Sequence, residues 1–161
     1  MPARFRWEFS MATKPITAAF PDFVLEVETE TEGTFAKICA LTQRGINRQH
    51  NMQTTEVPQD CDDESLPSAI ERAVQSSEVT IPASGVWSSQ SHKLLMDWWY
   101  SGQTKNIRVQ HVKAAVGDTE YETGPAYLVG LNNAVEKGQK VSAELDIQFD
   151  GVPARTAKVA P

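Results

Sequence analysis

Residues 35–112 read FAKICALTQRGINRQHNMQTTEVPQDCDDESLPSAIERAVQSSEVTIPASGVWSSQSHKLLMDWWYSGQTKNIRVQHV, in which strand-like segments flank one tryptophan-rich helix. The segment at residues 43–57 is rich in Asn, Gln, Arg and Thr, so it is too polar for a core strand and is predicted to be an extended arm. An acidic loop at residues 58–68 follows it. A polar arm and a very apolar helix both require neighbours. We therefore expect a subunit that assembles with other chains.

The helix predicted at residues 89–101 has recognisable ends, because Ser88 or Ser89 can cap its N-terminus and Gly102 can end it in the left-handed conformation. Its apolar side chains cover more than half of the circumference, whereas a helix on one sheet needs a stripe of about 100°. We expect a second subunit to cover the surplus. The predicted interface residues on this helix are Met96, Trp98, Trp99 and Tyr100.

The flanking sequence predicts an antiparallel β fold. Residues 23–29 and 34–42 form a first hairpin, and further strands are expected at residues 78–86, 104–112, 121–135, 141–149 and 152–159. Asp150-Gly151 is a hairpin signal that predicts the last strand pairing back on the one before it. Pro82 favours an edge position for its strand, and residues 67–75 are predicted as a short helix. The expected architecture is mainly β, a β-sandwich or barrel with one flanking α-helix.

Length and composition describe one domain. We predict an N-terminal extension or arm at residues 1–22 and a single β domain at residues 23–161 of the 161-residue chain. Residues 1–10 are interpreted as an upstream start, an added extension or a native arm, because Met11 begins a typical start. The net charge of −6 argues against a surface that grips nucleic acid, and no apolar run is long enough for a membrane span. Cys39 and Cys61 are expected to be reduced.

No catalytic, cofactor or metal site is predicted. Asp60, Asp62, Asp63 and Glu64 lack the order of ligands that bends a loop around calcium. His50, His92 and His111 lie in three elements without metal-ligand spacing. Trp87, Trp98 and Trp99 could stack on sugars or bases, but packing is favoured because they neighbour an apolar stripe. A carbohydrate- or peptide-binding β-sandwich and a small β-barrel enzyme remain as alternatives.

The order of these features resembles that of tailed-bacteriophage tail tube proteins (major tail proteins). The resemblance covers roughly residues 23–159. The residues that carry it are Lys37-Ile38-Cys39-Ala40-Leu41-Thr42 running into Arg44-Gly45, Glu56-Val57-Pro58, Asp60-Cys61-Asp62-Asp63, Ser84-Gly85-Val86, the helix with paired aromatics and the final Phe149-Asp150-Gly151. The first ten residues and Pro82 depart from the pattern.

The resemblance implies a tail-tube fold that assembles as hexameric rings, stacked into a hollow tube through which the genome leaves the virion. The implied partners are other copies of the chain, a tail-tip or baseplate initiator, a tape measure protein and a tail terminator. DNA would pass through the lumen without specific binding, and no membrane or cofactor is implied. The tail would be assembled in the host bacterial cytoplasm. A secretion-system tube subunit is the nearest alternative within this class.

Two sets of residues follow as predicted contact surfaces. The arm at residues 43–57 is expected to be unstructured in the monomer and to order on reaching the next ring. Its predicted interface residues are Arg44, Asn47, Arg48, His50, Asn51 and Thr54. An acidic lumen would repel DNA and let it slide. The polar side of the clearest strand predicts Glu144, Asp146 and Gln148 as lumen-facing residues.

Overall fold

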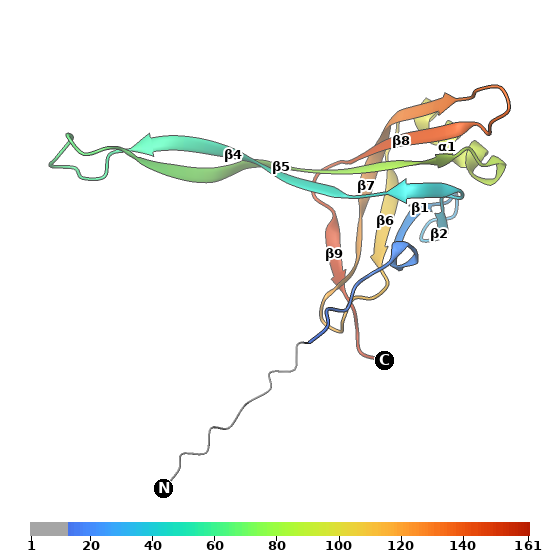
Figure 1. Ribbon diagram of the computed structural model, residues 1–161, viewed down its shortest axis with the longest axis horizontal. Coiled ribbons are helices and arrows are strands. Elements are labelled where there is room, and N and C mark those ends of the chain that lie inside the picture. The colour runs from blue at the N-terminus through green and yellow to red at the C-terminus, as the bar shows by residue number, and fades with distance from the viewer. Residues whose placement is uncertain (1–12) are drawn as a thin grey trace, which may run out of the picture.

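The computed structural model describes residues 13–161, so the predictions for residues 1–10 lie outside the described residues. It consists of a nine-stranded antiparallel sheet with one α-helix, which confirms the mainly β prediction (Figure 1). The elements are the 3-10 turn η1 (Phe20–Asp22), the strands β1 (Phe23–Glu28), β2 (Phe35–Lys37), β3 (Leu41–Arg44), β4 (Asn47–Val57), β5 (Ala69–Val86), β6 (Lys105–His111), β7 (Thr119–Ala134), β8 (Ser142–Phe149) and β9 (Ala154–Ala157), and the helix α1 (Ser89–Ser101).

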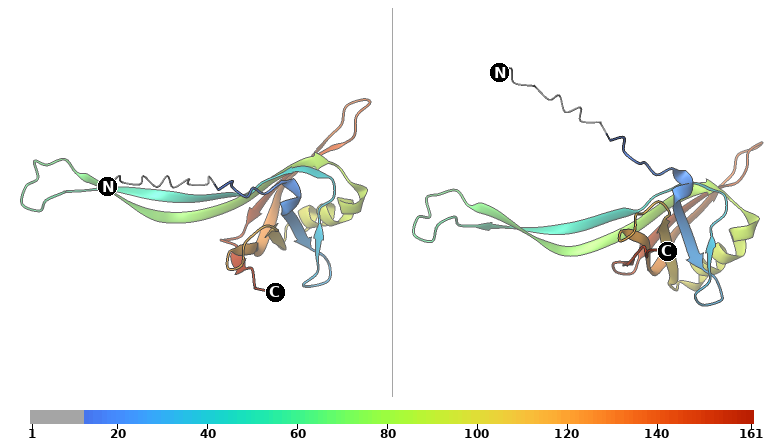
Figure 2. Two further views of the ribbon diagram at one scale, coloured as in Figure 1. Left: turned by 60° about the horizontal axis from the view of Figure 1, so that its bottom comes forward. Right: turned by 90° about the horizontal axis from the view of Figure 1, so that it is seen from below.

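The strand order is β2-β1-β6-β7-β8-β5-β3, with β4 paired to β5 and β9 paired to β7. The body of the molecule comprises these strands and α1, except that β4 and the outer half of β5 leave it as a long two-stranded hairpin. Two further views show the same projection away from the body (Figure 2). The predicted first hairpin is confirmed for β1 and β2, which pair around the turn that contains Gly33. Its second strand was predicted to run to residue 42 and is wrong beyond Lys37, because Leu41 begins β3, which pairs with β5.

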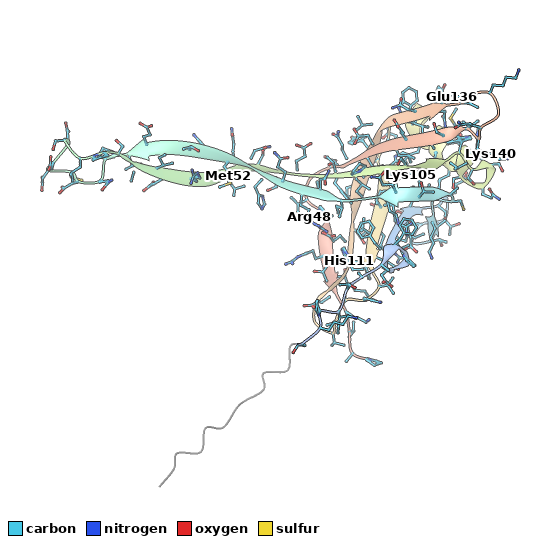
Figure 3. The ribbon with its side chains drawn as sticks, viewed as in Figure 1. Arg48, Met52, Lys105, His111, Glu136 and Lys140 are labelled. Atoms are coloured by element: carbon cyan, nitrogen blue, oxygen red, sulfur yellow. The ribbon has the colours of Figure 1, made fainter. Side chains whose placement is uncertain are left out.

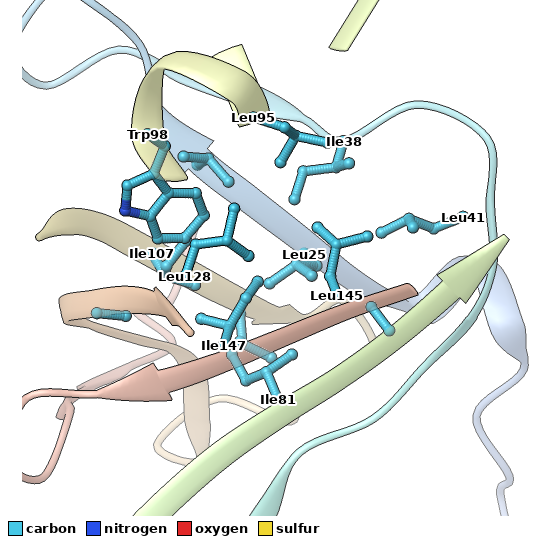
Figure 4. Packing of buried hydrophobic residues seen from close by; sticks show 14 of the residues in the cluster. Leu25, Ile38, Leu41, Ile81, Leu95, Trp98, Ile107, Leu128, Leu145 and Ile147 are labelled. Carbon is cyan, nitrogen blue, oxygen red and sulfur yellow. The ribbon is translucent and has the colours of Figure 1, made fainter. Parts of the chain in front are cut away.

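The core lies between the inner face of the sheet and α1. Strand β8 shows how the sequence directs this packing, because Ala143, Leu145, Ile147 and Phe149 are buried while Glu144 and Asp146 point outward. Trp98 and Leu95 of α1 point into the same cluster, near Ile107, Leu128 and Ile38 (Figure 4).

Helix α1 has the predicted bounds. The Ser88 hydroxyl accepts a hydrogen bond from the Gln90 N–H, and Gly102 ends the helix with φ of +63°. Both caps satisfy backbone groups that a helix end leaves without partners. The indole N–H of Trp98 donates to the Gln103 carbonyl at 3.1 Å, which fixes the ring over the core.

The helix predicted at residues 67–75 is wrong, because these residues enter the 18-residue strand β5. Their backbone groups pair with β4 from Val57↔Ala69 onward. The edge position predicted from Pro82 is also wrong, because β5 pairs with β8 on one side and with β3 and β4 on the other. The Pro82 carbonyl accepts from Gly45, which lies in the break between β3 and β4. The missing N–H of the proline therefore falls where the ladder is interrupted.

The last strand was predicted to fold back on β8, and this is wrong as well. Strand β9 pairs with Thr119–Thr123 of β7, directly beyond the residues of β7 that pair with β8. Since β6 occupies the other edge of β7, β8 and β9 lie end to end along one edge. Between them the Asp150 N–H still donates to the Pro125 carbonyl of β7 at 2.8 Å, and Gly151 has φ of +87°. The chain then continues antiparallel to β7 as β9.

Replacing Gly85 by alanine should weaken the junction of β3 and β5. A Cβ atom at this position would lie 2.8 Å from the Leu41 Cα and would overlap the Ala40 carbonyl, and both are backbone atoms that cannot move alone. We expect Gly85→Ala to lower the free energy of unfolding by about 1–3 kcal/mol, measured by urea denaturation. Gly45→Ala is the matched control, because its Cβ would meet only Pro82 Cγ at 3.9 Å. Equal stability of the two variants would contradict the prediction.

Candidate functional site

The hairpin of β4 and β5 is the most prominent surface feature. The 11 residues of β4 pair with β5 from Asn47↔Thr80 to Val57↔Ala69. At about 3.3 Å per residue, β4 is about 36 Å long. Of the arm predicted at residues 43–57, residues 47–57 form β4, whereas Gln43 and Arg44 belong to β3 in the body. Strand β4 is paired with β5 in a single chain. The prediction that it is unstructured in the monomer is wrong, because the missed strand at residues 69–77 satisfies its backbone.

The two faces of this ribbon differ. Met52 lies opposite Val74, and Ile70 lies four residues further along β5 on the same face, beyond Arg72. Val79, on the same face of β5, is buried in the core. The core-facing side of the sheet therefore continues beyond the body, where three apolar side chains alternate with polar ones such as Arg72 and Glu56. We call Met52, Ile70 and Val74 the hairpin stripe; about half of each side chain is exposed.

The end of the hairpin is the acidic loop at residues 58–68, as predicted. It carries Asp60, Asp62, Asp63 and Glu64 without a lysine or arginine. The hydrogen bonds from the side chain and the backbone N–H of Ser65 lower the pKa of Asp63. Cys61 is exposed in this loop. Within residues 13–161 no group of three or more His, Cys, Asp and Glu residues is placed to hold a metal ion.

A buried carboxylate joins the root of the hairpin to the body. Glu122 of β7 is only 4% exposed, and its Oε1 accepts from Arg48 Nε of β4 at 2.9 Å. Its Oε2 accepts from Arg48 Nη2 and lies 3.0 Å from His111 Nε2 of β6. Burial alone would raise the pKa of Glu122, but the hydrogen bonds from Arg48 and His111 outweigh it and lower the pKa. We call these three residues the root cluster; Figure 3 labels Arg48 and His111 where the hairpin meets the body.

The root cluster predicts a pH dependence of stability. Because the pKa of Glu122 lies below its ordinary value of 4.5 in the folded chain, its stabilising effect is fully present above pH 4.5. The effect is lost as the pH falls through the lowered pKa. We expect the urea midpoint of Glu122→Gln to fall less steeply than that of the unchanged chain below pH 4.5. Glu136→Gln, at an exposed loop position, is the control. Parallel acid profiles for Glu122→Gln and the unchanged chain would refute the assignment.

The exposed aromatic residues of α1 form a second surface. Trp99 and Tyr100 are 45% and 74% exposed, and their rings meet edge to face at 5.1 Å between centroids. Met96 is half-buried. Trp98 differs, because it is 1% exposed within one chain and packs in the core. Its prediction as an interface residue is therefore corrected, since its indole cannot reach another subunit.

The outer face of the sheet has a shallow polar hollow where β3, β5, β7 and β8 lie side by side. Glu144 lies between Ser84 and Asn132 in the ladder, and Asp146 lies next along β8. Gln148 is half-buried and donates to an Asp146 carboxylate oxygen at 3.4 Å. The three residues predicted to face a lumen therefore share one outward face, which supplies two carboxylates and an amide.

The residues predicted on the arm have several roles. Arg44 donates to the carbonyls of Phe23 and Phe20 at 2.7 and 3.0 Å, so it holds the N-terminal side of β1. His50 and Asn51 bond to Ser77 and Ser76 across the hairpin. Arg48 belongs to the root cluster, whereas Asn47 and Thr54 are exposed on β4.

Sequence reasoning missed Glu122 and the hairpin stripe. Ile70 and Val74 have a spacing that fits a helix as well as a strand. Glu122 has no local signal, because its partners are 11 and 74 residues away in the sequence.

No helix in residues 13–161 has the length and apolar character needed to cross a bilayer.

Comparison with known families matches residues 17–155 to the phage tail tube protein family. A comparison with curated protein sequences finds no match.

Solved structures share the fold. The tail of an empty gene transfer agent (GTA) particle, refined with C6 symmetry, is similar at a TM-score of 0.70 and 17% identity over 88% of this chain and 100% of that chain. The virion of a native GTA particle is similar at a TM-score of 0.65 and 16% identity, over 88% and 100% of the two chains. The SPP1 tail tube is similar at a TM-score of 0.63 and 14% identity, over 91% and 81%.

Proposed function

The chain belongs to the phage tail tube protein family, and we propose that it forms hexameric rings that stack into a hollow tube for genome passage. The six-fold symmetry of the GTA tail supports the ring order, because the two chains share a fold over 88% of this one. The proposed location is the virion tail, with assembly in the host cytoplasm. The proposed role is structural and not enzymatic.

The β4/β5 hairpin carries the proposal. A two-stranded ribbon exposed on both faces is marginally stable in water, and its stripe of Met52, Ile70 and Val74 has no cover within residues 13–161. A second copy of the chain would cover it. Because the hairpin projects from one side of the body, such a contact joins different surfaces of two subunits. Repeated contacts of that kind generate rings or stacked filaments.

The remaining surfaces fit the same proposal. Trp99 and Tyr100 of α1 are proposed to contact a neighbouring subunit, because exposed aromatic pairs are typical of interfaces. Asn47, His50, Asn51 and Thr54 are proposed to do so from β4. Edge strands of adjacent subunits would pair around the ring. The buried Trp98 weighs against the alternative of a sugar-binding module, which requires tryptophans on an exposed platform.

The lumen is proposed to be acidic. Glu144, Asp146 and Gln148 share the outer face of β8, away from the core. If six chains form a ring, each contributes a formal charge of −6. A negative wall repels phosphates, so DNA would slide without specific binding. We further propose that residues 23–161 fold as one domain, and that a tail-tip initiator, a tape measure protein and a tail terminator are partners of the tube.

Negative-stain electron microscopy of the purified chain, with its mass in solution, tests the proposal. We expect rings or tubes with a central channel and an assembled mass in multiples of six chains. A monomer at high protein concentration would next be mixed with a tail-tip initiator complex. A chain that stays monomeric with the initiator present would overturn the proposed assembly.

A further inference from the structure

We propose that the root cluster of Arg48, Glu122 and His111 is a latch that fixes the direction in which the β4/β5 hairpin leaves the body. The effect of this latch on assembly rests on the proposed function, because a hairpin must point at the neighbouring subunit to reach it. The latch itself is a property of the single chain. Arg48 and Glu122 are positioning residues in this proposal, and neither needs to touch another subunit.

The hairpin needs such a fixing point. Beyond the body β4 pairs only with β5, and two-stranded ribbons twist and bend more than wide sheets. The register also shifts between Asn51 and Met52, where β5 contains one extra residue. A bulge of this kind bends the strand and increases its twist. The backbone ladder alone therefore leaves the direction of the hairpin weakly determined.

Arg48 supplies a constraint at the root of the hairpin, on the body side of this bulge. Among residues 13–161, its bonds to Glu122 are the side-chain hydrogen bonds that connect β4 to a strand other than β5. Since β7 is separated from β5 by β8 in the sheet, this contact ties the hairpin to a distant point of the body. The planar guanidinium meets both carboxylate oxygens, which restricts orientation as well as distance.

The burial of Glu122 indicates that its ion pair selects one direction of the hairpin more than it adds to the free energy of unfolding. The carboxylate of Glu122 is taken out of water and loses Coulomb gain to desolvation, whereas the Arg48 side chain is 48% exposed. The best-attested use of a buried ionic group is to select one arrangement over others. His111 lies 3.0 Å from Oε2 and holds the carboxylate from β6. Its ring in turn packs against Phe23 at 5.7 Å between centroids. His111 thereby holds the Glu122 carboxylate in place for Arg48.

Arg155 of β9 determines which substitution is informative. It lies opposite Glu122 in the ladder and lines the same hollow as Arg48 and His111. A loss of Arg48 could leave Arg155 as a substitute partner for the carboxylate. Substitution of Glu122 removes the acceptor for both arginines, so Glu122→Gln is the main test.

The two cysteines of the chain allow a direct measurement of hairpin direction. Cys61 lies in the acidic loop at the end of the hairpin, and Cys39 lies between β2 and β3, where its N–H bonds to the Ser91 hydroxyl at 2.9 Å. Both are exposed and can carry spin labels without new substitutions. The distance between the labels is measured by double electron–electron resonance on the monomeric chain.

We expect one narrow distance distribution for the unchanged chain and a distribution at least twice as wide for Glu122→Gln. The yield of assembled tubes should fall more than tenfold. Glu26→Gln is the matched control, because it removes an ion pair of similar design between β1 and Arg108 of β6, with 2.7 Å between Arg108 Nε and Glu26 Oε2. It should leave the distance distribution unchanged.

A second variant, Arg48→Met with Glu122→Leu, keeps the test valid if Glu122→Gln fails to fold, because it leaves no unpaired buried charge. An unchanged distribution in a folded variant without the cluster would overturn the latch, as would equal broadening in Glu26→Gln. These outcomes are separate from the proposed function. The distance measurement needs no tube, and the unchanged chain tests tube formation by itself.

Discussion

Removal of residues 51–76, with an Asn-Gly turn joining His50 to Ser77, should give a folded monomer that forms no tubes. His50 and Ser77 face each other in the ladder, so a two-residue turn can close the shortened hairpin. The buried part of β5 begins at Val79 and is retained, together with Arg48. The melting temperature should therefore stay within a few degrees of the original, while electron microscopy should show complete loss of tubes.

A milder pair of variants separates the chemistry of the hairpin from its length. Replacement of Met52, Ile70 and Val74 by threonine removes the hairpin stripe but keeps residues suited to strands. It should reduce tube yield strongly. Replacement of Gln53 and Thr55 by serine changes the opposite face and should leave tubes intact. Normal tubes from the shortened hairpin would refute its role in assembly.

Trp98→Ala should destabilise the fold by about 3–5 kcal/mol, which is the usual cost of removing a large aromatic ring from a core. Trp98 is 1% exposed and also loses its hydrogen bond to Gln103 on substitution. The measurement is the free energy of unfolding in urea. Trp99→Ala is a control on the same helix, because Trp99 is 45% exposed. It should change stability little and affect assembly instead. An unchanged unfolding curve for Trp98→Ala would contradict the buried position.

Local patterns in the sequence were sufficient to predict the elements that pack one face against the core. Helix α1 was predicted with its bounds, because Ser88, Gly102 and the apolar stripe are all local signals. Strand β8 alternates without interruption, so its buried and exposed faces were also predictable. The two tryptophans of the stripe were not distinguishable in this way. Residues 98 and 99 are 100° apart, and which of them is buried depends on how the helix rotates against the sheet.

The errors share a different cause. The outer part of β5 has no core to impose alternation, so Ile70 and Val74 gave an ambiguous period and were interpreted as helical. Strand β9 follows a strong turn signal, yet it pairs with β7 because that edge is open beyond Phe149. The partners of Glu122 are likewise set by strand order. Pairing between distant strands carries no signal in a short window of sequence.

The 18 residues of β5 place two very different environments on one continuous strand. The amides from Thr80 to Val86 are held between neighbouring strands of the body, whereas those from Ala69 to Val79 depend on β4 alone. Local opening of the ribbon leaves the body intact, so amide hydrogen exchange in the outer half proceeds without global unfolding. A partner that covers the ribbon would slow amide exchange in the outer half of β5. The exchange rates along a single strand thus record separately whether the chain has folded and whether it has found its neighbour.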